Sequence, residues 1–388
     1  MASVELFLVL IFTHHQGREK WYKRTDFSSS APMRYSPANI TVDSDEVTDA
    51  WKVCVMNGVY FGGNEYSGSL GVRVSSVFVI LFVSTCFTMF PLVARRIKSL
   101  RIPELAYLLA RHFGSGVILA TAYVHLMDPA YEEIGPSSCV GMSGHWADYS
   151  WPPALMLISV ATIFTLDVYS EVYVEQKYGP MRQVSVVDVI AGNRGDDDLE
   201  QELTRQRSVS KDDFTVSDES MVEVSFRTQI AAFLILEFGV VFHSVMIGLN
   251  LGACGYNDFR VLYPAMVFHQ SFEGLGIGAR LSAIPFAADK KSWPWLLCLL
   301  YGLTTPICVA IGIGVRTTYN PNSFAGNIVQ GVLNSISAGI LMYTALVELI
   351  ARDFLFGPER PKTLGRATLL LAFLFSGAGI MALLGKWA

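Results

Sequence analysis

Eight stretches of the chain are apolar over about the length that crosses a lipid bilayer. A helix needs about 20 mainly apolar residues to span the hydrocarbon core, because it rises about 1.5 Å per residue. The stretches are 74–93, 104–127, 152–170, 229–251, 262–284, 294–315, 324–349 and 367–386. Backbone groups in lipid must be hydrogen-bonded within the segment, so the pattern predicts an all-α integral membrane protein with eight transmembrane helices.

The composition supports a membrane protein. The 388 residues are 52% hydrophobic and 16% charged, whereas soluble domains have about 45–50% and about 25%. The net charge is −5 and no basic face is evident, which argues against nucleic-acid binding. The lipid bilayer is therefore the predicted environment of the chain.

Charges in the short loops predict the orientation. Basic residues gather between the first and second spans, the fifth and sixth, and the seventh and eighth, whereas the alternate loops have almost none. Cytosolic loops are enriched in Lys and Arg, so we expect both termini outside the cell. The basic residues are Arg95, Arg96, Lys98, Arg101, Lys290, Lys291, Arg352, Arg360, Lys362 and Arg366.

The segments outside the spans complete the predicted organisation. The first 20 residues contain a short apolar run that a signal peptide would have, but Glu5 and the lack of a basic start favour an ordinary tail. Ser208 and Ser210 lie in a polar loop where phosphorylation would allow regulation, although a solvated linker is the favoured interpretation. The expected segments are an extracellular tail (1–70), helices one to three (71–170), a flexible cytosolic loop (171–227) and helices four to eight (228–388).

Two cysteines flank spans on the predicted external side. Cys54 lies in the N-terminal tail and Cys139 follows the second span, and disulfides persist outside the cytosol. We expect these two to pair, with Cys254 as the competing partner.

Polar side chains inside the spans concentrate in the fourth and fifth. Ionisable residues there are costly and usually face a partner, a cavity or a transport pathway. In the fifth span, helical spacing places His269, Gln270 and Glu273 on one face. Together with His243 and Ser244 of the fourth span they form two adjacent candidate sites. Imidazole and carboxylate ligands suit Zn²⁺ or Fe²⁺.

Each of these residues also has a structural interpretation. A single His in a span is more often an interhelical hydrogen-bonding group, and Ser or Gln commonly joins helices. The five residues together favour a metal site.

Glu237 in the fourth span is a candidate for the inward path. His125 and Asp128, at i and i+3, could attract a cation at the outer mouth, although an interfacial histidine and a helix-terminal aspartate explain them equally well.

Three strings closely resemble the ZIP (ZRT/IRT-like) family of zinc and iron uptake transporters, particularly its fungal plasma-membrane branch. They are ARHFGSGVILATAYVHLMDPA, LEFGVVFHSVMIGLNLGA and HQSFEGLGIGARL, and the resemblance covers about 71–175 and 226–388. It implies eight helices with external termini, a binuclear centre between helices four and five, and import of metal into the cytosol. It also implies that spans one, four, five and six move as a unit against the others.

By motif, the resemblance places the first metal at His243, His269 and Glu273, and the second at Ser244, Gln270 and Glu273. One departure concerns the second position. Some members carry Glu where this chain has Ile247, which removes a carboxylate and would weaken that position.

Alternatives remain for the function. An intramembrane metallohydrolase could use the same ligands, but HQSFE has an amide where a zinc peptidase of the HExxH type has its general base. A metal-sensing receptor would bind the ion without moving it. The ligand types do not rank zinc against iron or manganese, and the sequence leaves open whether the chain acts as a monomer or a homodimer.

Overall fold

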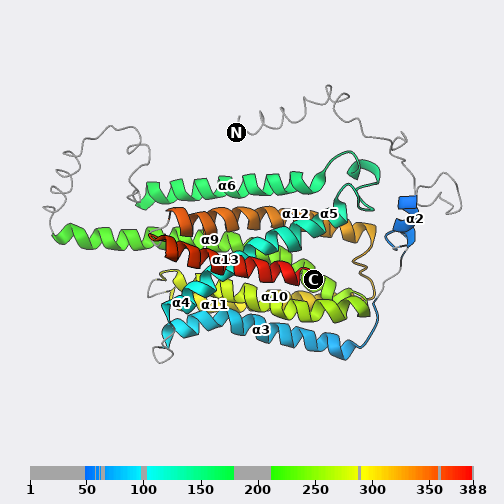
Figure 1. Ribbon diagram of the computed structural model, residues 1–388, viewed down its shortest axis with the longest axis horizontal. Helices are drawn as coiled ribbons and strands as arrows, with labels where there is room; N and C mark the ends of the chain where they lie inside the picture. Colours follow the sequence, from blue (N-terminus) through cyan, green and yellow to red (C-terminus); the bar gives the residue numbers. More distant parts are fainter. Residues whose placement is uncertain are drawn as a thin grey trace, which may run out of the picture.

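The computed structural model describes residues 49–56, 58–60, 62, 66–97, 103–178, 211–286, 290–356 and 360–386. Residues 1–20, Ser208 and Ser210, which carry the signal-peptide and phosphorylation interpretations, lie outside these ranges. All regular structure in the described ranges is helical, as expected (Figure 1). The elements are α2 (Asp49–Met56), α3 (Leu70–Arg96), α4 (Glu104–Ala120), η4 (Thr121–Met127), α5 (Asp128–Ile134), η5 (Gly144–Trp146), α6 (Trp151–Tyr178), α9 (Lys211–Ala253), α10 (Tyr256–Ala283), α11 (Trp293–Val315), α12 (Phe324–Tyr343), η7 (Thr344–Phe356) and α13 (Leu364–Leu384).

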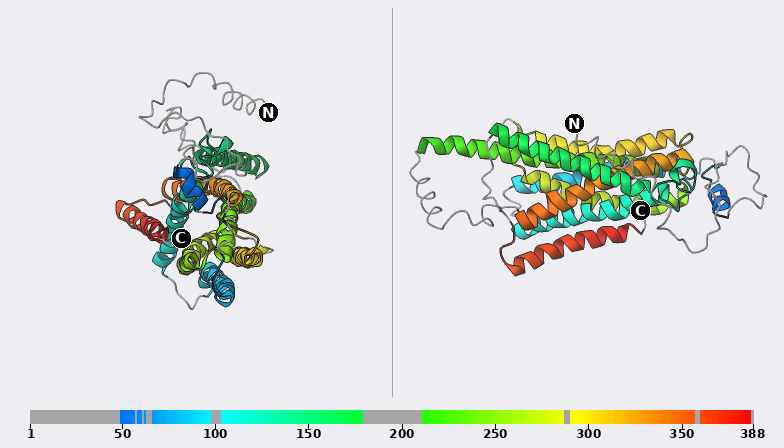
Figure 2. Two further views of the ribbon diagram at one scale, coloured as in Figure 1. Left: turned by 90° about the vertical axis from the view of Figure 1, so that its right-hand side faces the viewer. Right: turned by 90° about the horizontal axis from the view of Figure 1, so that it is seen from above.

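The long helices lie side by side along one axis, and the views in Figures 1 and 2 show them as a bundle. Seven of the described helices are long and apolar enough to cross a membrane, which makes the chain a multi-pass membrane protein. The segment expected as the fifth span forms the 28-residue helix α10 but is not among the seven. Its polar residues His269, Gln270 and Glu273 interrupt the apolar run.

Several helices extend beyond the expected limits. The second span continues from α4 through η4 and α5, and the seventh continues from α12 through η7. η4 and η7 are π-helical over 7 and 13 residues, and interruptions of an α-helix by π-helix are frequent at functional sites. The expected loop 171–227 is partly helical, because α6 runs to Tyr178 and α9 begins at Lys211.

Apolar side chains cover the outside of the bundle and polar ones occupy its centre. Phe78 of α3 and Phe375 of α13 are 65% and 64% exposed, whereas His269 and Glu273 of α10 are fully buried. Lipid tails can cover exposed aromatic side chains at no hydrophobic cost, so this distribution suits a bilayer.

The helices pack as two groups. The first group contains α3, α9, α10 and α11, which make their most extensive contacts with one another. The second contains α4, α6, α12 and α13. These groups have the same membership as the two units that the family resemblance implies. α10 also packs directly on α4, so it connects the groups at the centre of the bundle.

The two ends of the bundle differ in chemistry. At the end where α3 begins, Cys54 and Cys139 form a disulfide with their Cα atoms 5.6 Å apart. Cys254 is a free, buried thiol at the same end, 3.8 Å from the guanidinium of Arg73. The described residues of the basic loops, including Arg95 and Lys290, lie at the other end of the helices.

Glycines allow α10 to lie against both α3 and α4 without intervening side chains. A Cβ atom added at Gly276 would lie 2.6 Å from the Cα atom of Gly114 in α4. A Cβ atom at Gly278 would lie 2.0 Å from the backbone oxygen of Thr88 in α3. Gly274 also faces α3, since a Cβ atom added there would lie 2.7 Å from Thr88 Oγ1.

We expect Gly278→Ala to destabilise the protein by about 1–3 kcal/mol, because a backbone oxygen cannot move aside as a flexible side chain would. Thermal unfolding of the protein purified in detergent measures the effect. Gly314→Ala is the matched control, since a Cβ atom at Gly314 of α11 would have no neighbour within 4 Å. Equal melting temperatures for the two variants would contradict the close contact between α10 and α3.

Candidate metal centre

Two buried histidines meet where α9 and α10 pass each other. The Nε2 atoms of His243 and His269 are 3.2 Å apart, and their ring centroids are 5.2 Å apart. Glu273 lies one turn after His269, and its Oε2 atom is 3.5 Å from the Nε2 atom of His269. The i, i+4 spacing thus places Glu273 beside His269 as expected, and His243 reaches the same point from the neighbouring helix.

Gln270 lies in the same cluster but is engaged by other side chains. Its Nε2 atom donates to the Thr305 hydroxyl at 2.9 Å, and its Oε1 atom accepts from the Tyr301 hydroxyl at 3.2 Å. Tyr301 also lies 3.2 Å from Glu273 Oε2. Tyr301 and Thr305 belong to α11, a span without charge, so hydropathy and charge gave no sign of them in the sequence.

Several polar atoms of α9 and α10 around this cluster are buried without a hydrogen-bond partner among the described residues. Buried polar atoms in native proteins are nearly always paired, so such a concentration requires an explanation. A hydroxyl and carboxylate oxygens are suitable metal ligands, and in both histidines the nitrogen that faces the cluster is Nε2, not the unpartnered Nδ1. The atoms are His243 Nδ1, Ser244 Oγ, His269 Nδ1, Glu273 Oε1 and Glu237 Oε2.

The described part of the chain contains no group of three His, Cys, Asp or Glu side chains that could hold a metal ion as they stand. The spacing of the individual donors is nevertheless informative. Two ligands about 2.1 Å from a tetrahedral zinc lie about 3.4 Å from each other. The distances of 3.2 Å and 3.5 Å on either side of His269 Nε2 are close to that value.

Comparisons with known proteins agree with the motifs. The family model described as "ZIP Zinc transporter" matches residues 70–385. The chain belongs to the ZIP family. It is 54% identical to Zinc-regulated transporter 1 of Saccharomyces cerevisiae over 367 residues, covering 92% of this chain and 97% of that protein.

Other ZIP relatives are more distant. Zinc-regulated transporter 1 of Schizosaccharomyces pombe is 37% identical over 92% of this chain and 93% of its own length. Fe(2+) transport protein 1 of Oryza sativa subsp. japonica is 32% identical over 82% and 85%. These relatives are named as transporters, and this ZIP chain is accordingly a transporter and not a metallohydrolase.

The three remaining candidate residues, His125, Asp128 and Glu237, do not lie together in this ZIP bundle. His125 is buried in η4, with its ring centroid 5.0 Å from that of His269, and its Nε2 atom is 3.2 Å from the backbone oxygen of Met381. Asp128 is exposed, so the two residues expected to act together at the outer mouth face different surroundings. Glu237 lies two turns before Ser244 on α9, toward the basic end of the bundle.

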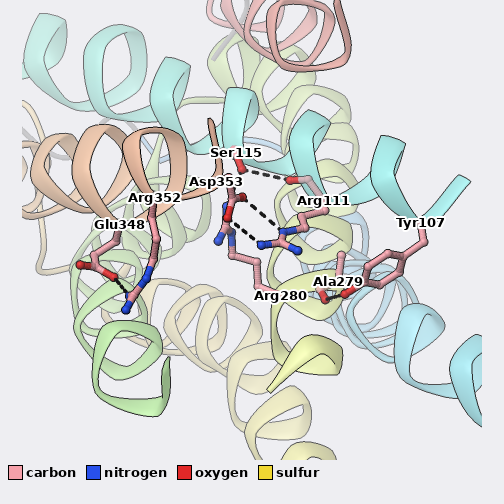
Figure 3. Close-up of polar contacts among 8 residues, drawn as sticks. All are labelled: Tyr107, Arg111, Ser115, Ala279, Arg280, Glu348, Arg352 and Asp353. Atoms are coloured by element: carbon pink, nitrogen blue, oxygen red, sulfur yellow. Dashed lines mark hydrogen bonds and ion pairs between the residues drawn. The ribbon is translucent and has the colours of Figure 1, made fainter. Parts of the chain in front are cut away.

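An ion cluster joins α4, α10 and η7 toward the basic end (Figure 3). The Arg111 guanidinium contacts both carboxylate oxygens of Asp353, at 2.6 Å and 3.3 Å. Arg280 donates to Asp353 at 2.9 Å and to the Ser115 hydroxyl at 2.8 Å. Arg280 is two turns after Glu273 on α10, so the cluster joins α10 to the other helix group.

We expect Asp353→Asn to destabilise the purified protein by about 3–5 kcal/mol, because the substitution leaves two largely buried guanidinium groups without their carboxylate. Thermal unfolding in detergent is the measurement. Glu348→Gln is the control: it keeps the shape of the side chain and removes the charge of a pair within one helix, whose Arg352 and Glu348 are 35% and 13% exposed, so it should cost clearly less, about 1 kcal/mol. A melting temperature of Asp353→Asn equal to that of Glu348→Gln would contradict the structural role of the cluster.

Proposed function

We propose that this ZIP transporter lies in the plasma membrane and imports Zn²⁺ into the cytosol through a site between α9 and α10. The observation that carries the proposal is the meeting of His243, His269 and Glu273, all fully buried at the centre of the bundle. The relatives named as zinc-regulated transporters support zinc as the substrate.

In this proposal α10 is the eighth membrane span. Its polar centre lowers its hydropathy, yet its burial among neighbouring helices shields those residues from lipid, where they would be costly. Eight spans place both termini on one side. The disulfide at one end and the basic residues at the other support an external location for the termini, since disulfides persist outside the cytosol and basic loops stay inside.

The first metal binds His243, His269 and Glu273, and the second binds Ser244, Gln270 and Glu273. The donor distances around His269 Nε2 support the first position, and the unpartnered Ser244 Oγ and Glu273 Oε1 support the second. Ile247 supplies no ligand, so we expect the second position to be the weaker one.

The path of the ion begins at the disulfide end. A cavity of about 520 Å³ there is lined by residues that include Glu132 and Glu133, which can attract a cation. His125 then lies between this end and His269, and Glu237 follows on the inward side. Release requires the two helix groups to separate at the Asp353 cluster, because Arg280 belongs to one group and Arg111 to the other.

An Fe²⁺ importer is the alternative within the same proposal. The relative named Fe(2+) transport protein 1 favours it, and the imidazole and carboxylate ligands accept either ion. Competition of labelled zinc uptake by unlabelled iron separates the two. With zinc as the preferred substrate, equimolar iron should leave most of the zinc uptake intact.

Glu273→Ala should remove nearly all uptake of labelled zinc by cells that express the protein, because both proposed metal positions share this carboxylate. Glu348→Ala is the control, since Glu348 pairs with Arg352 on η7 outside the centre. Uptake is compared at equal amounts of protein on the cell surface. Wild-type uptake by Glu273→Ala would exclude the proposed centre.

A further inference from the structure

The hydroxyl group of Tyr301 links two residues of the proposed metal centre from a third helix. Tyr301 is 2% exposed, and its hydroxyl oxygen is 3.2 Å from both Gln270 Oε1 and Glu273 Oε2. A phenolic hydroxyl has one proton, so it donates to one of these oxygens at a time. It therefore couples the orientation of the two side chains.

The amide of Gln270 is fixed at both of its ends. Gln270 Nε2 donates to Thr305 Oγ1, which leaves Gln270 Oε1 to accept from Tyr301 and from the Ser84 hydroxyl at 3.4 Å. Tyr301 and Thr305 are four residues apart and so lie on one face of α11. Thr305 holds the amide nitrogen and Tyr301 holds the carbonyl oxygen, so the two hydroxyl groups together fix the orientation of the Gln270 amide.

The two oxygens of Glu273 have different surroundings. Oε2 lies near Tyr301 and His269, whereas Oε1 is buried and has no hydrogen-bond partner among the described residues. A donor that holds one carboxylate oxygen restricts rotation of the group and leaves the other oxygen free for an ion. Hydrogen-bonded partners of metal ligands orient them, and their loss typically lowers metal affinity or activity about 10- to 100-fold.

We propose that Tyr301 and Thr305 of α11 are positioning residues that hold Glu273 and Gln270 in the orientation needed to receive the metal ion. The proposal rests on the metal centre described under the proposed function. It assigns a role to α11, whose own residues include no Asp, Glu, His, Lys or Arg.

The test is the concentration dependence of labelled zinc uptake by cells expressing Tyr301→Phe, corrected for protein on the cell surface. This substitution removes only the hydroxyl and keeps the ring packed in the core. We expect the KM for zinc to rise at least about tenfold, with Vmax per molecule within about twofold of the wild type. A role in folding alone would lower the amount of protein and leave KM unchanged.

Tyr343→Phe is the matched control. Tyr343 is also buried, at 7% exposed, but its hydroxyl donates to Asp167 at 2.6 Å, between α12 and α6. Removing that hydroxyl should leave the KM for zinc unchanged. A comparable rise in KM for both variants would overturn the proposal, since the effect would then follow from loss of any buried hydroxyl.

Thr305 gives a second test that does not depend on the folding of the tyrosine variant. Thr305→Val keeps the shape and removes the acceptor for Gln270, and should raise KM, whereas Thr305→Ser should retain the wild-type value. Wild-type KM in Tyr301→Phe, or in Thr305→Val if the tyrosine variant does not reach the surface, overturns the proposal. Glu273→Ala is tested alongside, to separate the metal centre from the positioning role. If Glu273→Ala loses uptake while the α11 variants keep the wild-type KM, only the positioning role is rejected.

Discussion

Burial of polar groups on α9 and α10, inside a bundle that meets lipid with apolar side chains, is the constraint on which the rest of the structure depends. His243, His269 and Glu273 can lie at the centre only because neighbouring helices separate them from the hydrocarbon. α10 accordingly occupies the middle of the bundle, and glycines bring it into direct backbone contact with α3 and α4. The same burial leaves polar atoms of the proposed metal centre unpaired, which is costly for folding and useful for binding an ion.

Polar contacts within the two helix groups differ in kind from those between them. Within the first group, α11 supports the side chains of α10 through Tyr301 and Thr305. Between the groups, Asp353 and its two arginines hold α10 against α4 and η7. In the proposed transport, the first set of contacts persists while the groups move, whereas the second breaks. A transporter needs both kinds of contact, because its site must stay assembled while access to it changes.

Much of this arrangement could be predicted from the sequence, for identifiable reasons. Long apolar runs predicted the helices, and the motifs HS and HQSFE predicted that His243, His269 and Glu273 come together. The extension of α9 to Lys211 could not be predicted, because polar residues continue a helix into water as readily as they form a loop. Tyr301 and Asp353 were also missed. Tyr301 lies in a span that reads as uniformly apolar, and the arginine partners of Asp353 come from helices far away in the sequence.

The most direct test of the account is X-ray absorption at the zinc K-edge, measured on the purified protein loaded with zinc. Ligation by His243, His269 and Glu273 predicts nitrogen and oxygen neighbours at about 2.0–2.1 Å together with the outer scattering of imidazole rings. The His243→Ala/His269→Ala double variant should lose that imidazole contribution. An unchanged imidazole signal in the double variant would contradict the account, because zinc would then be bound by histidines elsewhere in the chain.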